Sequence, residues 1–337
     1  MKVKLGELTK IRTGKLDANA ASEDGAYPFF TCSKEPLRIS TYSYDCECVL
    51  VAGNGDLNAK YYNGKFDAYQ RTYIIESNGD GRLHLPYLYH FMTRYIQELR
   101  KLSIGGVIKY IKLGNLTDAE ISLPDIKEQK TACKKLEKIK NIIDKKESQL
   151  FYLDNLIKAR FVEMFGDVYK SSKYSRKKWS DIVDIKNGKD YKKVAVKDGG
   201  FPVYGTGGEM ARASEYLCPE NTIIVGRKGT INNPLLVREK FWNVDTAFGV
   251  IPGKELHHLY FFWFCRMFDF SRLNKQAVLP STTKADLLNI EMQVPPIEIQ
   301  NQFAIFIAQV DKSKFVLSNE LTMCDFYIRL IHDRVMH

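Results

Sequence analysis

The chain has 337 residues, 45% of them hydrophobic and 27% charged, a composition that excludes an intrinsically disordered protein. It has no apolar run of about 18 residues and no apolar segment near its start, so we expect neither a membrane-spanning helix nor a secretory signal. The net charge of +10 favours a polyanionic partner, although a basic protein without such a partner is an equal alternative on charge alone. Seven cysteines without paired spacing favour reduced thiols in a cytoplasmic protein.

The first part of the chain is predicted to be a mixed α+β domain. It begins with LGELTKIRTGK (residues 5–15) and continues with short runs rich in Val, Ile, Tyr and Phe that Gly and Asn separate, a pattern typical of strands and turns. Residues 85–102 predict an aromatic-rich helix packed on the sheet. The segment ISLPDIKEQ (residues 121–129) then predicts a short strand, a proline stop and the start of a long helix.

The second part repeats this order about 170 residues later, which indicates an internal duplication. The segments that match the first part are, in chain order, WSDIVDIKNGK (179–189), VGRKGTIN (225–232, against VAGNGDLN at 51–58), LHHLYFFWF (256–264, against LHLPYLYHF at 83–91) and MQVPPIEIQ (292–300). Each half therefore predicts one α+β domain followed by one long helix.

Both long helices carry apolar residues at heptad spacing, interrupted by Lys146, Arg160 and Lys314. Because heptads recur in both copies, we predict that the helices pack on each other as an antiparallel coiled coil and relate two pseudo-symmetric domains. The alternative is that each helix packs only on its own domain. The predicted seam residues are Leu136, Ile139, Ile143, Leu150, Leu153, Ile157, Ile307, Val310, Leu317, Leu321, Ile328 and Ile331.

The sequence predicts no catalytic site. It contains no P-loop motif for ATP, and its six histidines have neither metal-ligand nor triad spacing. The glycines of YGTGG (residues 204–208) could suggest an S-adenosylmethionine site, but the matching segment of the first half has no glycines. We therefore expect no catalytic residue, no metal and no cofactor in this chain.

Loops that combine glycine with basic, hydroxyl or amide residues are better candidates for DNA contact. Arg, Lys, Asn and Gln can bond base edges or meet phosphates, and glycine lets the backbone approach closely. For any single residue, a solvated turn is the alternative. The candidates are Asn54, Ser103, Lys109, Tyr110, Lys112, Arg227, Lys228, Thr230, Lys275, Gln276, Ser281, Thr282, Thr283 and Lys284.

Over essentially its whole length the chain resembles the specificity (S) subunit of type I restriction–modification systems. The resemblance is carried by LGELTKIRTGK and WSDIVDIKNGK, and by the exits ISLPDIKEQ and MQVPPIEIQ, which are similar to the family's Leu-Pro-Pro-x-x-Glu-Gln transition into a central helix. The first exit has Asp125 in place of the second proline, and the second exit separates Glu298 from Gln300.

The resemblance implies a non-catalytic subunit with target-recognition domains at residues 1–124 and 167–295 and coiled-coil helices at 125–166 and 296–337. The two domains would each read one half of a bipartite site in double-stranded DNA. The coiled coil would measure the spacer and dock two methyltransferase (M) subunits, and restriction (R) subunits could join. S-adenosylmethionine, ATP and Mg would be used by the partner subunits.

Two other classes of function stay open on the sequence. One is a coiled-coil protein-interaction scaffold without sequence-specific DNA binding. The other is a self-contained methyltransferase, which would bind S-adenosylmethionine without a partner. Selective duplex binding in the presence of methyltransferase subunits separates the specificity subunit from the scaffold, and calorimetry with S-adenosylmethionine tests the enzyme.

Overall fold

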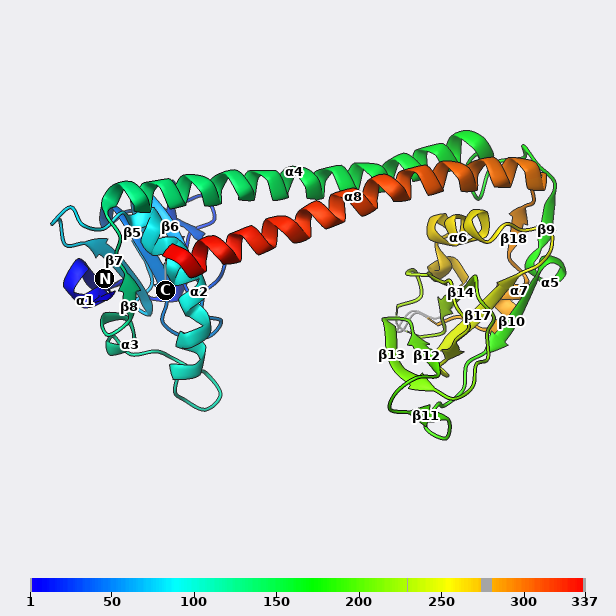
Figure 1. Ribbon diagram of the computed structural model, residues 1–337, viewed down its shortest axis with the longest axis horizontal. Coiled ribbons are helices and arrows are strands. Elements are labelled where there is room, and N and C mark those ends of the chain that lie inside the picture. The colour runs from blue at the N-terminus through cyan, green and yellow to red at the C-terminus, as the bar shows by residue number, and fades with distance from the viewer. Residues whose placement is uncertain (1, 229, 274–280, 336–337) are drawn as a thin grey trace. The chain divides into compact units, whose positions relative to one another are not determined.

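The computed structural model describes residues 2–228, 230–273 and 281–335, and the chain divides into two compact units (Figure 1). Unit 1 comprises Met1–Lys146 and Asn319–His337, and unit 2 comprises Glu147–Ser318. Each unit holds one domain of mixed helices and strands together with one part of each long helix. The predicted α+β class is confirmed.

Unit 1 has a six-stranded sheet in the order β2-β7-β5-β6-β3-β4 and a separate β1–β8 ladder. The helix α2 packs on β5 and β6 through a face that includes Leu88 and Met92. The strands are β1 (Lys2–Lys4), β2 (Thr9–Thr13), β3 (Tyr27–Phe30), β4 (Leu37–Ile39), β5 (Tyr44–Ala52), β6 (Ala59–Ala68), β7 (Thr72–Ser77) and β8 (Glu120–Ser122), and the short helices are α1 (Leu5–Leu8), η1 (Ala18–Ala20), α2 (Leu85–Leu102) and α3 (Gly114–Thr117).

Unit 2 has two four-stranded sheets, β10-β17-β14-β15 and β11-β13-β12-β16, and a separate β9–β18 ladder. The strands are β9 (Arg176–Lys178), β10 (Val183–Asn187), β11 (Ala195–Val196), β12 (Phe201–Gly205), β13 (Gly208–Ala213), β14 (Thr222–Gly226), β15 (Leu235–Val237), β16 (Trp242–Asn243), β17 (Ala247–Pro252) and β18 (Glu291–Gln293), and the short helices are α5 (Trp179–Ile182), α6 (His258–Met267), η2 (Phe270–Leu273) and α7 (Lys284–Leu288).

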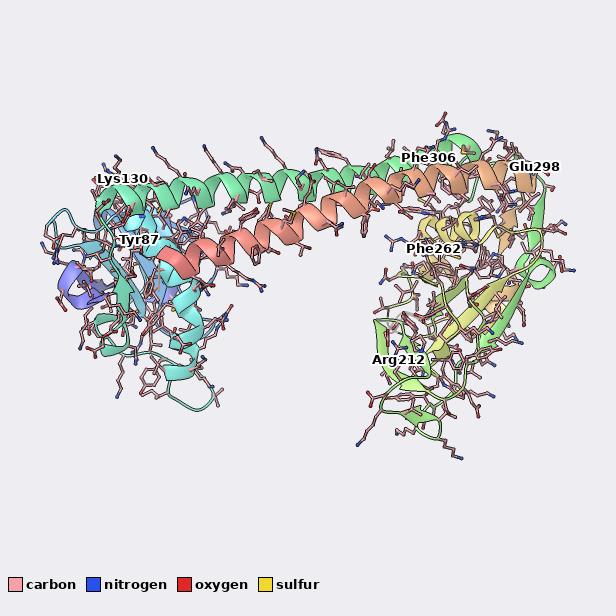
Figure 2. The ribbon with its side chains drawn as sticks, in the orientation of Figure 1. Tyr87, Lys130, Arg212, Phe262, Glu298 and Phe306 are labelled. Atoms are coloured by element: carbon pink, nitrogen blue, oxygen red, sulfur yellow. The ribbon has the colours of Figure 1, made fainter. Side chains whose placement is uncertain are left out.

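The two units share a framework that follows the repeat in the sequence. The order β2-β7-β5-β6 in unit 1 corresponds to β10-β17-β14-β15 in unit 2. Tyr87 on α2 (Figure 2) donates a hydrogen bond to the carbonyl of Ser122 at 2.8 Å, and Tyr260 on α6 donates to the carbonyl of Gln293 at the same distance. Burial raises the pKa of both phenols, so each stays a neutral donor that ties a helix to the exit strand.

The long helices α4 (Ile126–Phe165) and α8 (Ile297–Val335) pack against each other, which confirms the predicted helix pair. In unit 1, Leu136 of α4 lies in one core with Ile328 and Ile331 of α8. In unit 2, Phe165 of α4 contacts Phe303 of α8, with ring centroids 5.4 Å apart. Residue numbers rise along α4 as they fall along α8, so the packing is antiparallel within each unit.

All twelve predicted seam residues are at least partly buried. Leu136, Ile157, Ile307 and Val310 are buried, and the remaining eight are half-buried. Burial recurs every third or fourth residue along both helices, as heptads require. The seam is therefore continuous but shallow away from the two domain cores.

The lysines that interrupt the seam are paired across it. In unit 1, Lys146 Nζ lies 2.6 Å from Glu320 Oε2, and in unit 2, Lys314 forms an ion pair with Asp154. Both lysine side chains are largely covered while their partners are more exposed, so the aliphatic stems contribute to the seam and the ammonium groups reach its edge.

Candidate nucleic-acid interface

In unit 1 the two predicted contact loops lie side by side. The loop after β5 and the segment after α2 are joined by hydrogen bonds from the Ile111 amide to the Gly53 carbonyl (2.9 Å) and from the Gly55 amide to the Lys109 carbonyl (3.0 Å). Asn54 forms a β-bridge with Tyr110. Candidates that are half a domain apart in sequence thus form one surface.

Residues 104–110 form a tight hairpin that projects from this surface. The amides of Ile104 and Tyr110 each donate to the other's carbonyl, at 3.0 and 2.9 Å. Gly105 has a φ of +116°, and a Cβ at this position would lie 2.6 Å from the Ile108 carbonyl oxygen. The turn therefore requires glycine here.

The candidates in unit 1 differ in what their side chains can contact. Lys109, Tyr110 and Lys112 are exposed, and Asn54 is half-buried. The Ser103 hydroxyl donates to the Arg100 carbonyl at 2.7 Å, so it caps the end of α2. Beneath the loops the Tyr73 phenol, whose pKa is raised by burial, donates to the Ile111 carbonyl at 3.2 Å.

Unit 2 repeats this arrangement with other side chains. The Thr282 amide donates to the Arg227 carbonyl at 3.0 Å, in the place of the bond between Ile111 and Gly53 in unit 1. Lys228 forms a β-bridge with Ser281. Arg227, Lys228 and Thr230 are exposed, whereas Ser281 is half-buried.

Three further candidates in unit 2 make internal hydrogen bonds. The buried Thr282 hydroxyl donates to the Gly226 carbonyl at 2.7 Å, and Thr283 closes a capping box with Asp286 at the start of α7. Lys284 Nζ donates to the Ile185 carbonyl at 2.7 Å. These side chains hold the loop in place. Lys275 and Gln276 lie outside the described residues.

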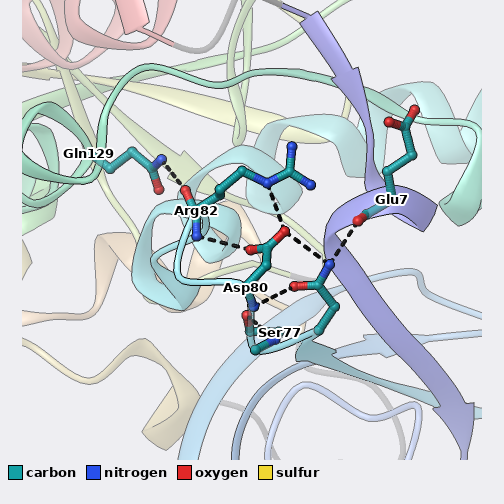
Figure 3. A network of polar contacts seen from close by, with 7 residues as sticks. Glu7, Ser77, Asp80, Arg82 and Gln129 are labelled. Atoms are coloured by element: carbon teal, nitrogen blue, oxygen red, sulfur yellow. Dashed lines mark hydrogen bonds and ion pairs between the residues drawn. The ribbon is translucent and has the colours of Figure 1, made fainter.

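The structure gives the glutamine of each exit motif a role that was not predicted. Gln129 in unit 1 is fully buried; its Oε1 accepts from the His84 amide (2.9 Å), and its Nε2 donates to the carbonyls of Arg82 (2.8 Å) and Pro124 (2.9 Å). The contact continues through Arg82 to Asp80 (Figure 3), whose pKa is lowered by the backbone amide and guanidinium of Arg82.

Gln300 in unit 2 makes the same three bonds: its Oε1 accepts from the His257 amide (2.7 Å), and its Nε2 donates to the carbonyls of Glu255 and Pro295 (both 2.8 Å). Only a primary amide combines two donors with an acceptor in this way. We call Gln129 and Gln300 the amide clamps. The recurring Gln was the signal in the sequence, but its partners are backbone atoms that the sequence does not reveal.

The residues that the structure describes contain neither a candidate membrane span nor a candidate metal site. No helix among them is both long and apolar enough to cross a bilayer. Among the same residues, no group of three His, Cys, Asp or Glu side chains is arranged to hold a metal ion.

Comparison with known proteins points to one family. The family described as "Type I restriction modification DNA specificity domain" matches residues 1–150 and 171–322. The type I restriction enzyme EcoDI specificity subunit of Escherichia coli is 40% identical over 156 residues, which are 46% of this chain and 34% of that protein. The match thus spans about a third of the length of this curated relative.

Two solved structures share the fold. The S subunit of a type I restriction–modification system from M. genitalium superposes with a TM-score of 0.64 at 15% identity, covering 100% of this chain and 96% of that one. A chain from a study of complex assembly and conformational transition of the type I R-M system gives a TM-score of 0.63 at 15% identity, covering 99% and 97%.

Proposed function

Because the chain belongs to the type I restriction–modification DNA specificity family, we propose that it selects the DNA target of such a system and reads a bipartite site with one domain in each unit. One observation carries this proposal. The same two loops meet through the same backbone hydrogen bond in both units, yet the residues that face each other there differ: Asn54 and Tyr110 in unit 1, Lys228 and Ser281 in unit 2. Two different side-chain sets on one framework suit two different half-sites.

Members of this family are specificity subunits, and catalysis lies with their M and R partners. We propose that the α4–α8 pair docks two M subunits, which would bring S-adenosylmethionine to the adenines of the target. R subunits would use ATP and Mg for cleavage. The present chain contributes binding and orientation alone.

The test of the proposed function is a genome-wide map of methylated adenines in the host, with and without the gene. We expect deletion to abolish methylation at one bipartite motif, and the intact gene to restore it. A methylation map that does not change on deletion contradicts the proposal. A chain that binds M subunits but shows no selective duplex binding would instead support the scaffold.

The exposed lysines of the unit 1 loops are expected to meet phosphates. Lys109→Ala and Lys112→Ala should each weaken binding of the assembled complex to its target and reduce the slope of log K against log salt by about one. Titrations at several salt concentrations measure this slope. Lys10→Ala, an exposed lysine on β2 of the same unit, is the matched control and should leave it unchanged. Unchanged slopes for the loop variants would exclude phosphate contacts.

We propose that the number of heptads in the helix pair sets the spacer length. Deleting 144–150 together with the facing residues 317–323 removes Lys146 and Glu320 as a pair and keeps Lys314 with Asp154. Seven helical residues span about 10 Å, so the preferred spacer should shorten by about three base pairs. Binding to duplexes with graded spacers measures this. An unchanged spacer preference, with both half-sites still recognised, contradicts the proposal that the helix pair sets the spacer length.

A further inference from the structure

The tip of the unit 1 hairpin is apolar, although it lies in a basic surface. Val107 is 105% exposed and Ile108 is 64% exposed, and Ile104 at the base of the hairpin is 43% exposed. Residues 104–108 read Ile-Gly-Gly-Val-Ile, without one side-chain hydrogen-bonding group. A tip of this composition can contact a partner through methyl groups and its backbone alone.

The tip is held in one shape by its own backbone. The paired bonds between Ile104 and Tyr110 close the hairpin, and the bond from the Gly55 amide to the Lys109 carbonyl fixes it to the loop after β5. The side chains of Val107 and Ile108 are β-branched and therefore restricted at χ1. Binding through this tip would cost little conformational entropy.

Charges around the tip favour a nucleic acid as its partner. Lys109 and Lys112 are exposed at the end of the hairpin and just after it. Lys101 is paired with Glu98 at 2.7 Å and Arg100 with Asp56 at 2.9 Å, so these two are less available. Ammonium groups beside an apolar tip can bind phosphates while the tip reaches the bases.

We propose that Val107 and Ile108 read thymine by packing against its 5-methyl group in the major groove. The 5-methyl of thymine is the one apolar group that an unmodified base pair presents in that groove. This inference rests on the proposed function and deepens it, since it names the base class that unit 1 reads. The hairpin is continuous with Asn54, Lys109 and Lys112, so phosphate binding and methyl contact would occur together.

The experiment uses the chain assembled with its M subunits and synthetic duplexes that carry the target found in the methylation map. Each thymine of the target is replaced in turn by deoxyuridine, which removes the methyl group and keeps every base-pairing atom. We expect one or two replacements in a single half-site to weaken binding about fourfold each, the factor that follows from losing one buried methyl group. Replacements in the other half-site should have no effect.

Val107→Ala and Ile108→Ala should weaken binding to the thymine duplex and abolish its difference from the deoxyuridine duplex. Leu37→Ala, which truncates an exposed apolar residue on the edge strand β4 of the same unit, should keep that difference. Far-UV circular dichroism and the thermal midpoint check that the variants fold.

Several outcomes overturn the inference. The first is wild-type binding that no deoxyuridine replacement weakens. The second is a tip variant that keeps the full difference between thymine and deoxyuridine duplexes. The third is a target whose half-site for unit 1 contains no A·T pair. Tip variants that lose M subunits without DNA present would assign the tip to a protein contact. In all these cases selective binding to the bipartite target survives. Failure of the proposed function would show instead as the absence of any selected target.

Discussion

We expect Gln129→Ala and Gln300→Ala each to lower the free energy of unfolding of their unit by about 2–4 kcal/mol. Each substitution leaves a backbone amide, that of His84 or His257, and two carbonyls without their side-chain partner in a site that is closed to solvent. An unsatisfied buried group costs about 1–3 kcal/mol, and water could re-enter to satisfy part of the deficit. Chemical denaturation measures the loss.

The unit affected should be the one that carries the substitution. Hydrogen exchange at the start of α2 should accelerate in Gln129→Ala, and at the start of α6 in Gln300→Ala. Gln302→Ala is the matched control, since this glutamine is exposed on the same helix as Gln300 and its loss should change stability by less than about 0.5 kcal/mol. Gln300→Glu keeps the shape of the side chain and loses both donors, so it should also destabilise. Equal losses of unfolding free energy in Gln300→Ala and Gln302→Ala would contradict the stabilising role of the amide clamp.

Phe165→Ala should destabilise unit 2 by about 3–5 kcal/mol. This ring, at the end of α4, is 1% exposed and lies with its centroid 4.6 Å from Tyr260 of α6 and 5.4 Å from Phe303 of α8. Truncation removes contacts to α6 and α8 and leaves a cavity that the surrounding rings cannot fill. Urea denaturation of the full chain followed by tryptophan fluorescence reports the change, because Trp179 and Trp263 lie in the same core.

The control for this prediction is Phe315→Ala on α8. Its side chain is 68% exposed, so truncation should alter stability by less than about 0.5 kcal/mol. If Phe165→Ala is equally mild, the end of α4 is not an integral part of the unit 2 core. In that case the recognition domain and its part of the helix pair would be able to separate.

The parts of the fold that depend on local pattern were predictable from the sequence. A window of about ten residues is enough to predict the heptads of α4 and α8 and the strand–proline–helix exits, because helical periodicity is a local signal. The aromatic helices α2 and α6 were predicted for the same reason. The pairing of the candidate loops was not predicted, since the bond between Ile111 and Gly53 joins residues far apart in sequence.

The arrangement of strands into sheets could not be predicted, nor could which candidate side chains face solvent and which bond the backbone. Although β3 (YPFF) and β12 (FPVYG) have similar sequences, β3 extends the main sheet of unit 1 and β12 lies in a second sheet of unit 2. Side-chain chemistry also left open whether a hydroxyl faces solvent or the backbone. Thr282 and Thr230 looked equivalent as candidates, yet Thr282 is buried on the Gly226 carbonyl and Thr230 is exposed.

The amide clamps have a consequence for how this chain can evolve. All six groups that Gln129 and Gln300 bind belong to the main chain. These hydrogen bonds therefore do not depend on the side chains of the residues that Gln129 and Gln300 contact. Substitutions in the candidate contact loops can therefore accumulate without weakening the junction between each domain and its long helix. A chimaera joined at Pro124 or Pro295 should place the domain of another protein on the same helix pair.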